Sequence, residues 1–203
     1  MPGFEACGGF DRSLTCCISS NWEAAVFRAT PRISGMKISK KDNREPIDVL
    51  YRVKRGLAAY ISYLAACEMN EAFSEYVLYE PLLRIMTARG YIVECEVECP
   101  GVQHAPTGDR RRLDFVARGH SLRLAIEVKW AQSATPDIRR DVEKLIAFRD
   151  TYPASLPLLC VFGRQLFVSL FTPPDGFRER GKAVYADLRK TKYGCRIFQL
   201  KVA

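Results

Sequence analysis

The sequence predicts an α/β protein in which helices flank a central mixed β-sheet, with the core elements in the order αβββαβ. Two observations lead to this fold class. The hydrophobic period changes from that of a helix to that of a strand near Tyr91, and a later helical segment separates the alternating segments from a short apolar run. An alternating strand is half-exposed, whereas an unbroken apolar run indicates a strand covered on both faces. Helices on either side of one sheet would satisfy both patterns.

The first elements follow residues 1–45, which we interpret as an N-terminal arm or small subdomain of unpredicted shape. Residues 46–203 form the second expected domain. Helices are expected at 46–66 and 69–89, because apolar residues recur there at helical spacing and Gly90 can end the second helix.

Three strands are expected next. In residues 91–98, glutamates alternate with apolar residues, which is typical of a half-exposed strand. Residues 112–117 are expected to form a strand, residues 122–130 alternate cleanly, and the short turn between them predicts a β-hairpin.

The last part of the chain begins with another helix. Pro136 suits the first position of a helix that Thr135 caps and that runs to about Asp150. The apolar run 158–162 is the strand expected to be covered on both faces. Three further elements are expected: a strand at 165–171, a helix at 176–189 and a strand at 195–202.

Length and composition limit the classes of protein to be considered. The chain has 203 residues, of which 48% are hydrophobic and 27% charged, so it can bury a core and is not disordered by composition. It has no apolar run of about 18 residues and no secretory signal, so we expect a cytoplasmic protein that does not contact a membrane. The formal net charge of +8 favours a polyanionic partner, most often nucleic acid.

The eight cysteines raise the question of zinc or disulfide bonds. No CxxC pair occurs, and only His104 and His120 could complete a zinc site, so a structural zinc ion is not expected. In a cytoplasmic protein the thiols should be reduced, and several should act as small core residues.

Two carboxylates and a lysine lie on the predicted hairpin. If its strands pair at the usual spacing of about 4.8 Å, Asp114 comes beside Glu127 on one face of the sheet. Two such carboxylates repel unless a cation lies between them, and Mg²⁺ prefers oxygen ligands of this kind. Lys129 projects to the same side and could orient the attacking water or offset charge on a phosphate. The set suits hydrolysis of a phosphodiester, although Glu127 and Lys129 could equally form a surface ion pair.

The motif Leu113-Asp114, followed by Glu127-Val128-Lys129 within this order of elements, resembles the PD-(D/E)XK nuclease superfamily. That superfamily includes restriction enzymes, Holliday-junction resolvases and RecB-type nuclease domains. The resemblance implies a restriction-endonuclease-like core and a metal-dependent endonuclease with DNA as the expected substrate. It also implies that Asp114, Glu127 and the Val128 carbonyl hold Mg²⁺, for which Mn²⁺ would substitute, and that Lys129 positions the water.

Many members of the superfamily add a glutamate from the first helix, for which Glu75 and Glu80 are the candidates. On a helix they would lie about 140° apart, so both cannot face the site. Glu75 lies on the apolar stripe expected to face the sheet. We therefore favour Glu75 as the additional catalytic residue and interpret Glu80 as solvated.

Basic residues near the motif are candidates for binding nucleic acid. Arg110, Arg111 and Arg112 precede Asp114 and are expected at the mouth of the site, against the phosphate backbone. Lys144 on the following helix could contact a phosphate, the alternative being a charged outer helix face.

Two other classes of protein remain open. One is a catalytically silent nucleic-acid-binding or protein-interaction module of the same fold, and the other is an interaction protein in which the motif is accidental. No separate recognition domain is evident, so specificity would come from a homodimer or from a partner protein.

Overall fold

The computed structural model describes residues 46–69, 73–102, 111–119, 122–188 and 190–201, and of residues 46–48 only the backbone. These residues belong to one compact unit that runs from Asn43 to Ala203. The predicted N-terminal arm, residues 1–45, lies outside the described residues.

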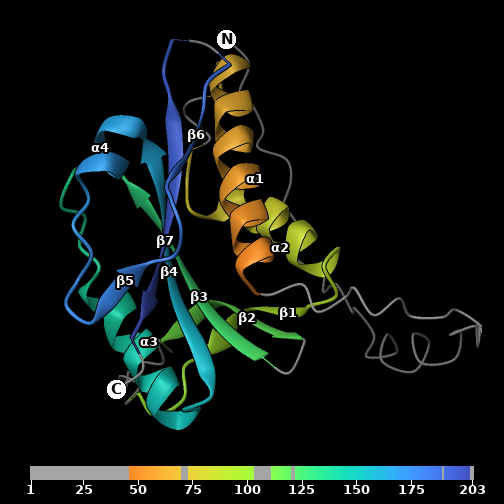
Figure 1. Cartoon of the computed structure of the whole chain (residues 1–203), viewed down its shortest axis with the longest axis vertical. Coiled ribbons are helices and arrows are strands. Elements are labelled where there is room, and N and C mark those ends of the chain that lie inside the picture. The colour runs from red at the N-terminus through yellow and green to blue at the C-terminus, as the bar shows by residue number, and fades with distance from the viewer. Residues whose placement is uncertain (1–45, 70–72, 103–110, 120–121, 189, 202–203) are drawn as a thin grey trace, which may run out of the picture. The chain divides into compact units, whose positions relative to one another are not determined.

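The described residues form one seven-stranded sheet (Figure 1). Its order is β1-β2-β3-β4-β7-β5, and β6 pairs with a further part of β7. Strands β3 and β4 are parallel and every other pair is antiparallel, so the sheet is mixed, as predicted. The strands are β1 (Ile92–Glu98), β2 (Arg112–Gly119), β3 (Leu122–Ala131), β4 (Ser155–Arg164), β5 (Phe177–Glu179), β6 (Val184–Ala186) and β7 (Tyr193–Leu200).

Helices cover both faces of the sheet (Figure 1). Helices α1 (Pro46–Ala66) and α2 (Tyr79–Thr87) pack on one face, and α3 (Arg139–Thr151) and α4 (Gln165–Leu170) pack on the other. A 3₁₀ turn, η3 (Tyr76–Leu78), leads into α2. The predicted α/β class with a mixed sheet flanked by helices is therefore confirmed.

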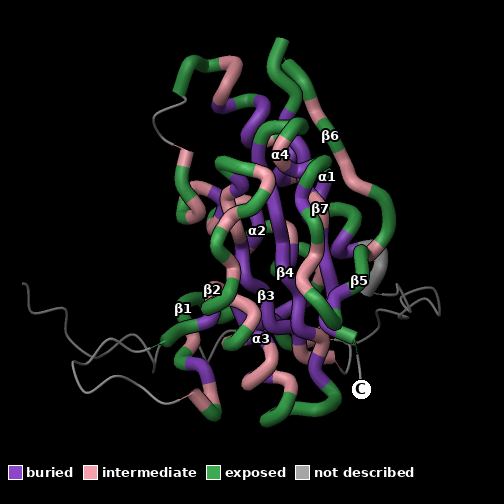
Figure 2. Tube along the Cα trace, turned by 90° about the vertical axis from the view of Figure 1, so that its left-hand side faces the viewer, coloured by how far each residue is buried: buried purple, intermediate pink, exposed green. Residues whose placement is uncertain are grey.

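The burial of β4 follows its apolar sequence pattern, whereas β3 is more buried than its alternation indicates, because α3 covers its second face (Figure 2). In β3, Ile126 and Val128 pack towards α1 and α2, while Ala125 packs towards α3. The apolar run of β4 is buried on both faces, with Leu158 on the α1 side and Leu159 on the α3 side. Apolar burial of this kind contributes roughly 25 cal/mol per Å², which makes these two strands the centre of the fold.

Helix α1 has the predicted bounds. Its buried residues recur at helical spacing and form the stripe Val49, Leu50, Val53, Leu57, Ala58, Ile61 and Leu64. Among the described residues, no helix is both long and apolar enough to cross a membrane.

The prediction of a helix over residues 69–89 is wrong at its start. Residues Phe73 to Glu75 are not helical, and α2 begins only at Tyr79. Pro81 accounts for the late start, because it lacks an N–H and so fits the first turn, where no intrahelical partner is required. Gly90 follows the helix with a φ of 83°, the left-handed conformation expected of a residue that ends a helix.

The helix expected to begin at Pro136 begins instead at Arg139. Thr135 does not cap it. Asp137 accepts a hydrogen bond from the Arg139 N–H (3.2 Å), which satisfies one of the free donors at the helix start.

Two elements after β4 differ from the prediction. Residues 165–171 were expected to form a strand and instead contain helix α4, in which Val168 is buried and Leu166 is exposed. Residues 176–189 were expected to form a helix and instead contain β5 and β6. Gly176 (φ 80°) and Gly181 (φ 68°) adopt left-handed conformations that a helix interior excludes, and the extended segments pair with the edge of β7.

Candidate active site

The structure brings the predicted residues together at one place on the sheet. Glu127 and Lys129 extend from β3 towards α3, and Asp114 lies on β2 one residue beyond the regular pairing, which starts at Phe115 opposite Ile126. The Val128 N–H donates to the Asp114 carboxylate (2.7 Å) instead of to a backbone carbonyl. Six residues form what we call the acid–lysine cluster: Glu75, Asp114, Glu127, Lys129, Asp141 and Lys144.

Glu127 is the most deeply buried member of the cluster, with a side chain only 2% exposed. The Lys144 ammonium donates to its Oε2 at 2.5 Å, whereas its Oε1 has no hydrogen-bond partner among the described residues. Burial raises the pKa of Glu127 well above its ordinary value, the charge of Asp114 adds to this, and Lys144 opposes it. Glu127 therefore has one carboxylate oxygen paired with Lys144 and one that no described residue satisfies.

Asp114 is held by two donors, the Val128 N–H and the Tyr79 hydroxyl (2.9 Å). Burial raises the pKa of Asp114 to about 6, against the lowering effect of both donors and of Lys144. The Tyr79 hydroxyl also lies 2.9 Å from the Glu96 carboxylate. Glu96 has a φ of 53°, which is uncommon for a residue other than glycine.

Lys129 lies between two carboxylates from distant parts of the chain. Its ammonium nitrogen is 3.4 Å from Glu75 Oε1 and 3.4 Å from Asp141 Oδ2. Burial lowers the pKa of Lys129, but the charges of Asp141 and Glu75 outweigh this and raise the pKa overall. Lys129 is thus held as a cation.

Glu75, and not Glu80, reaches the site. The Trp130 N–H donates to Glu75 Oε1 (3.1 Å), while Glu80 forms an exposed ion pair with Arg84 (2.8 Å). The choice of Glu75 is therefore consistent with the geometry, but the helical argument for it is wrong, because Glu75 precedes the helix.

Asp141 was not singled out from the sequence. It occupies the same stripe of α3 as Leu145 and Phe148, which are buried against the sheet. That spacing of four and three residues was the available signal. A carboxylate on the buried stripe of a helix needs a partner, and Asp141 has two, Lys129 and Lys144.

Lys144 points into the protein and not outwards. Its side chain is 12% exposed and its ammonium contacts Glu127, the Arg112 carbonyl (3.0 Å) and Asp141 (3.4 Å). The alternative of a charged outer helix face is wrong for Lys144. Its expected contact with a phosphate would require the ammonium to leave Glu127.

The arginine triplet is only partly described. Arg110 lies outside the described residues. Arg111 is paired with Glu143 (2.8 Å) on the exposed side of α3, and Arg112 is exposed at the start of β2. The backbone carbonyl of Arg112 accepts a hydrogen bond from Lys144, so this end of the triplet lies beside the acid–lysine cluster.

A cavity of about 560 Å³ opens beside the cluster. Glu75 and Lys129 line it, together with Trp130 and the stretch from Gln132 to Asp137 that precedes α3. A ligand in this cavity could contact the Lys129 ammonium.

The cluster holds four carboxylates and two ammonium groups, a formal charge of −2 when all are ionised. That charge matches one divalent cation. In the described part of the chain, however, no three or more His, Cys, Asp or Glu side chains are grouped to hold a metal ion by themselves. A cation here would need ligands other than side chains as well, such as a backbone carbonyl, water or phosphate.

The fold and the cluster define an α/β protein with a mixed sheet, helices on both faces and a partly buried set of acids and lysines at one end of a β-hairpin. No protein-family model matches the chain, and comparison with curated proteins and with solved structures gives no significant match.

Proposed function

We propose that the protein is a metal-dependent nuclease with a restriction-endonuclease-like core, which hydrolyses phosphodiester bonds, with DNA as the expected substrate. The observation that carries the proposal is Glu127 Oε1, a buried carboxylate oxygen that has no hydrogen-bond partner among the described residues and lies near a second, largely buried carboxylate, Asp114. An unsatisfied buried polar atom costs about 1–3 kcal/mol, and more when it is charged. A cation bound there would offset that cost.

The arrangement of elements supports the same proposal. Helix α2, the antiparallel strands β1 to β3, helix α3 and strand β4 parallel to β3 follow one another in the order of the nuclease core. Asp114 and Glu127-Val128-Lys129 occupy the second and third strands, where the motif requires them.

Mg²⁺ or Mn²⁺ fits the residues present. Asp114 and Glu127 would hold it with the Val128 carbonyl, and the remaining ligands would be water and substrate phosphate. A bound cation of this kind supplies Lewis acidity and neutralises charge on the phosphate.

The chain's own residues supply the rest of the chemistry. Lys129 is 24% exposed, borders the cavity of about 560 Å³ and is kept cationic by Glu75 and Asp141. Its role in the proposal is to orient the attacking water and to offset charge that develops on the phosphate. Glu75 and Asp141 act as positioning residues for the ammonium.

One contact favours a second candidate function. The Lys144 ammonium on Glu127 places a fixed positive charge beside the carboxylate that a cation would use. In a catalytically silent nucleic-acid-binding module, this lysine would replace the cation permanently. In the nuclease, Lys144 would swing from Glu127 when the cation binds.

A cleavage assay separates the nuclease from the silent module. Its substrates are supercoiled plasmid and single-stranded oligonucleotides, each incubated with Mg²⁺, with Mn²⁺ and with EDTA. The nuclease requires metal-dependent cleavage that Glu127→Gln abolishes. The matched control is Glu80→Gln, which makes the same change at an exposed carboxylate and should cleave at the wild-type rate. Binding of nucleic acid without cleavage under every condition would support the silent module.

A further inference from the structure

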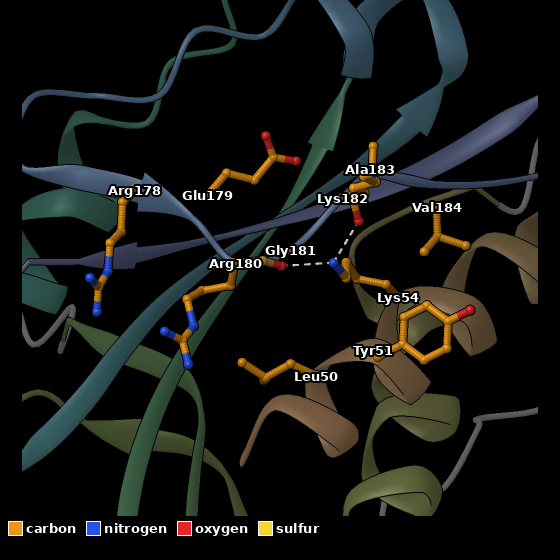
Figure 3. Close-up of a pocket in the computed structure, with 10 residues that line it drawn as sticks. All are labelled: Leu50, Tyr51, Lys54, Arg178, Glu179, Arg180, Gly181, Lys182, Ala183 and Val184. Carbon is orange, nitrogen blue, oxygen red and sulfur yellow. Dashed lines mark hydrogen bonds between the residues drawn. The ribbon is translucent and has the colours of Figure 1, made fainter. Parts of the chain in front are cut away.

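A second cavity lies where helix α1 meets the chain between β5 and β6 (Figure 3). It encloses about 800 Å³ and is lined by Leu50, Tyr51, Lys54 and the continuous segment 178–184. Pockets for small ligands usually have roughly 300–1,000 Å³. No member of the acid–lysine cluster lines this cavity, which belongs to the α1 side of the sheet.

The lining is strongly basic. Four of its residues are Lys or Arg and one is Glu, which gives a formal charge of +3. Glu179 points away from Arg178 and Arg180 in Figure 3, and its carboxylate is already paired with Arg196 (2.8 and 3.0 Å). Among the described residues, the side chains of Arg178, Arg180 and Lys182 have no hydrogen-bond or ion-pair partner. These cations are therefore available to an anionic ligand.

Lys54 adds a buried ammonium group to the wall of the cavity. The residue is 2% exposed, and its ammonium donates to the carbonyls of Arg180 (2.7 Å) and Lys182 (2.6 Å), which Figure 3 shows as dashed lines. Gly181, between them, has a φ of 68°, a conformation that lets both carbonyls turn to the same nitrogen. An ammonium has three donors, so one remains without a protein partner among the described residues.

The opposite wall of the cavity is apolar. Leu50, Tyr51 and Val184 lie there. Tyr51 is 49% exposed and the Arg55 guanidinium lies over its ring at 5.8 Å, so a flat partner would stack on the ring face that Arg55 does not cover. Planar guanidinium groups recognise phosphate oxygens in pairs, and an aromatic ring stacks on any nucleobase. A simple anion would use only the basic wall, and an apolar ligand only the other.

We propose that this cavity binds a nucleotide, with its phosphate on Arg178 and Arg180 and its base against Tyr51. The nucleotide is either a free mononucleotide or one unit of a nucleic-acid strand, because the two share this chemistry. The site is separate from the acid–lysine cluster and does not depend on cleavage.

Calorimetric titration of the full chain in EDTA tests the proposal without any contribution from turnover. The probes are thymidine 5′-monophosphate, thymidine and inorganic phosphate. The monophosphate should bind at least tenfold more tightly than either fragment, because only it engages both walls. Equal affinity for inorganic phosphate and for the monophosphate would overturn the proposal.

Substitutions in the cavity identify the residues that bind the nucleotide. Arg180→Ala, Arg178→Ala and Tyr51→Ala should each weaken binding of the monophosphate tenfold or more. The two arginine variants should fold normally, because neither arginine side chain has a partner among the described residues. Arg164→Ala removes an exposed arginine outside the cavity and should change the affinity less than twofold. Lys129→Ala should also leave it unchanged. Wild-type affinity in Arg180→Ala, with loss in Lys129→Ala, would place the nucleotide in the other site and overturn the proposal.

A 5′-phosphorylated thymidine tetranucleotide distinguishes the two sources. Binding tenfold tighter than that of the mononucleotide would identify a nucleic-acid strand as the occupant. Equal or weaker binding would identify a free mononucleotide.

Discussion

Asp141 bridges the two lysines of the acid–lysine cluster, at 3.4 Å from each ammonium nitrogen. The lysines nevertheless differ in what else they contact. The Lys144 ammonium is held in an ion pair with Glu127, whereas Lys129 borders an open cavity through which a substrate could reach it. Only Lys129 is therefore placed to act on a substrate without first breaking a short ion pair.

Substitution of Lys129 should separate chemistry from binding. Lys129→Ala should lose about 100-fold or more in single-turnover cleavage rate, the scale of one preorganised electrostatic group, because its charge acts as the reaction proceeds. Affinity for substrate in Ca²⁺ should change several-fold at most. Lys129→Arg should not restore the rate, since a planar guanidinium cannot replace a compact ammonium. Near wild-type rates in both variants would reduce Lys129 to a structural ion pair.

The raised pKa of Asp114 should make the free energy of unfolding decrease as the pH rises. Its pKa is about 6 in the folded protein, against an ordinary value of 3.8, so the folded state binds the proton more tightly. The corresponding stabilisation is present below about pH 4 and is lost as the pH rises through 6. Two pKa units correspond to about 3 kcal/mol.

Urea unfolding of the wild type and of Asp114→Asn, at pH 4 and pH 7, measures this effect. Relative to Asp114→Asn, the free energy of unfolding of the wild type should be about 2.4 kcal/mol lower at pH 7 than at pH 4. Addition of Mg²⁺ should recover stability at pH 7 in the wild type but not in Asp114→Asn. A difference that does not vary with pH would contradict the assignment of the raised pKa to Asp114.

At the level of single residues, sequence reasoning succeeded where a residue's neighbours along the strands decide its place. Asp114, Glu127 and Lys129 lie on one hairpin, so alternation and the short turn were enough to bring them together. Asp141 reaches the cluster because α3 packs across the sheet. Its place on the buried stripe of α3 was a local signal, but that signal does not identify Lys129 and Lys144 as its partners. The ion pair between Lys144 and Glu127 was missed for the same reason.

Among the elements, the strands with strong patterns were predicted and the short ones were not. The alternation of β3 and the apolar run of β4 are each long enough to identify a strand, although β3 is buried on both faces and not half-exposed as its alternation indicates. In contrast, β5 and β6 have three residues each and are extended because the edge of β7 offers them backbone partners. Pairing of this kind overrides local propensity, which for so short a segment is weak.

A substitution at Gly181 tests what holds the connection between β5 and β6 in its conformation. Gly181→Ala places a side chain at a φ of 68°, and its Cβ would lie 3.3 Å from Lys54 Nζ. We expect a loss of stability greater than about 1 kcal/mol, because the backbone is strained and the Lys54 ammonium must shift from its two carbonyls.

Gly176→Ala is the matched control for that loss. Its φ of 80° imposes a similar backbone cost, but its Cβ would meet only Leu200 at an ordinary 3.6 Å. Thermal unfolding of both variants should therefore show the larger decrease for Gly181→Ala. Equal decreases would mean that the contact with Lys54 contributes nothing.

For the molecule as a whole, the net charge of +8 should dominate its encounter with nucleic acid. Binding should weaken steeply with salt, because each phosphate neutralised by a basic side chain releases counterions. Replacement of Arg110, Arg111 and Arg112 by alanine should lower the magnitude of the salt slope by up to about three phosphate contacts.

Fluorescence anisotropy with a labelled duplex in Ca²⁺, over a series of salt concentrations, measures the slope. Arg52→Ala, Arg55→Ala and Arg84→Ala combined remove the same charge from the exposed surface of α1 and α2 and form the control. If both triple variants reduce the slope equally, the arginine triplet is not a specific contact.

The strand order also has a consequence for how the chain folds during synthesis. Strand β7 lies between β4 and β5, yet it is the last strand of the sheet to be made, about 30 residues after β4 ends. Until Tyr193 to Leu200 leave the ribosome, β4 presents an unpaired edge that is apolar on both faces. Such an edge is a template for pairing with another chain. We expect nascent chains stalled before Tyr193 to aggregate or to engage chaperones, and release of the final strand to close the sheet.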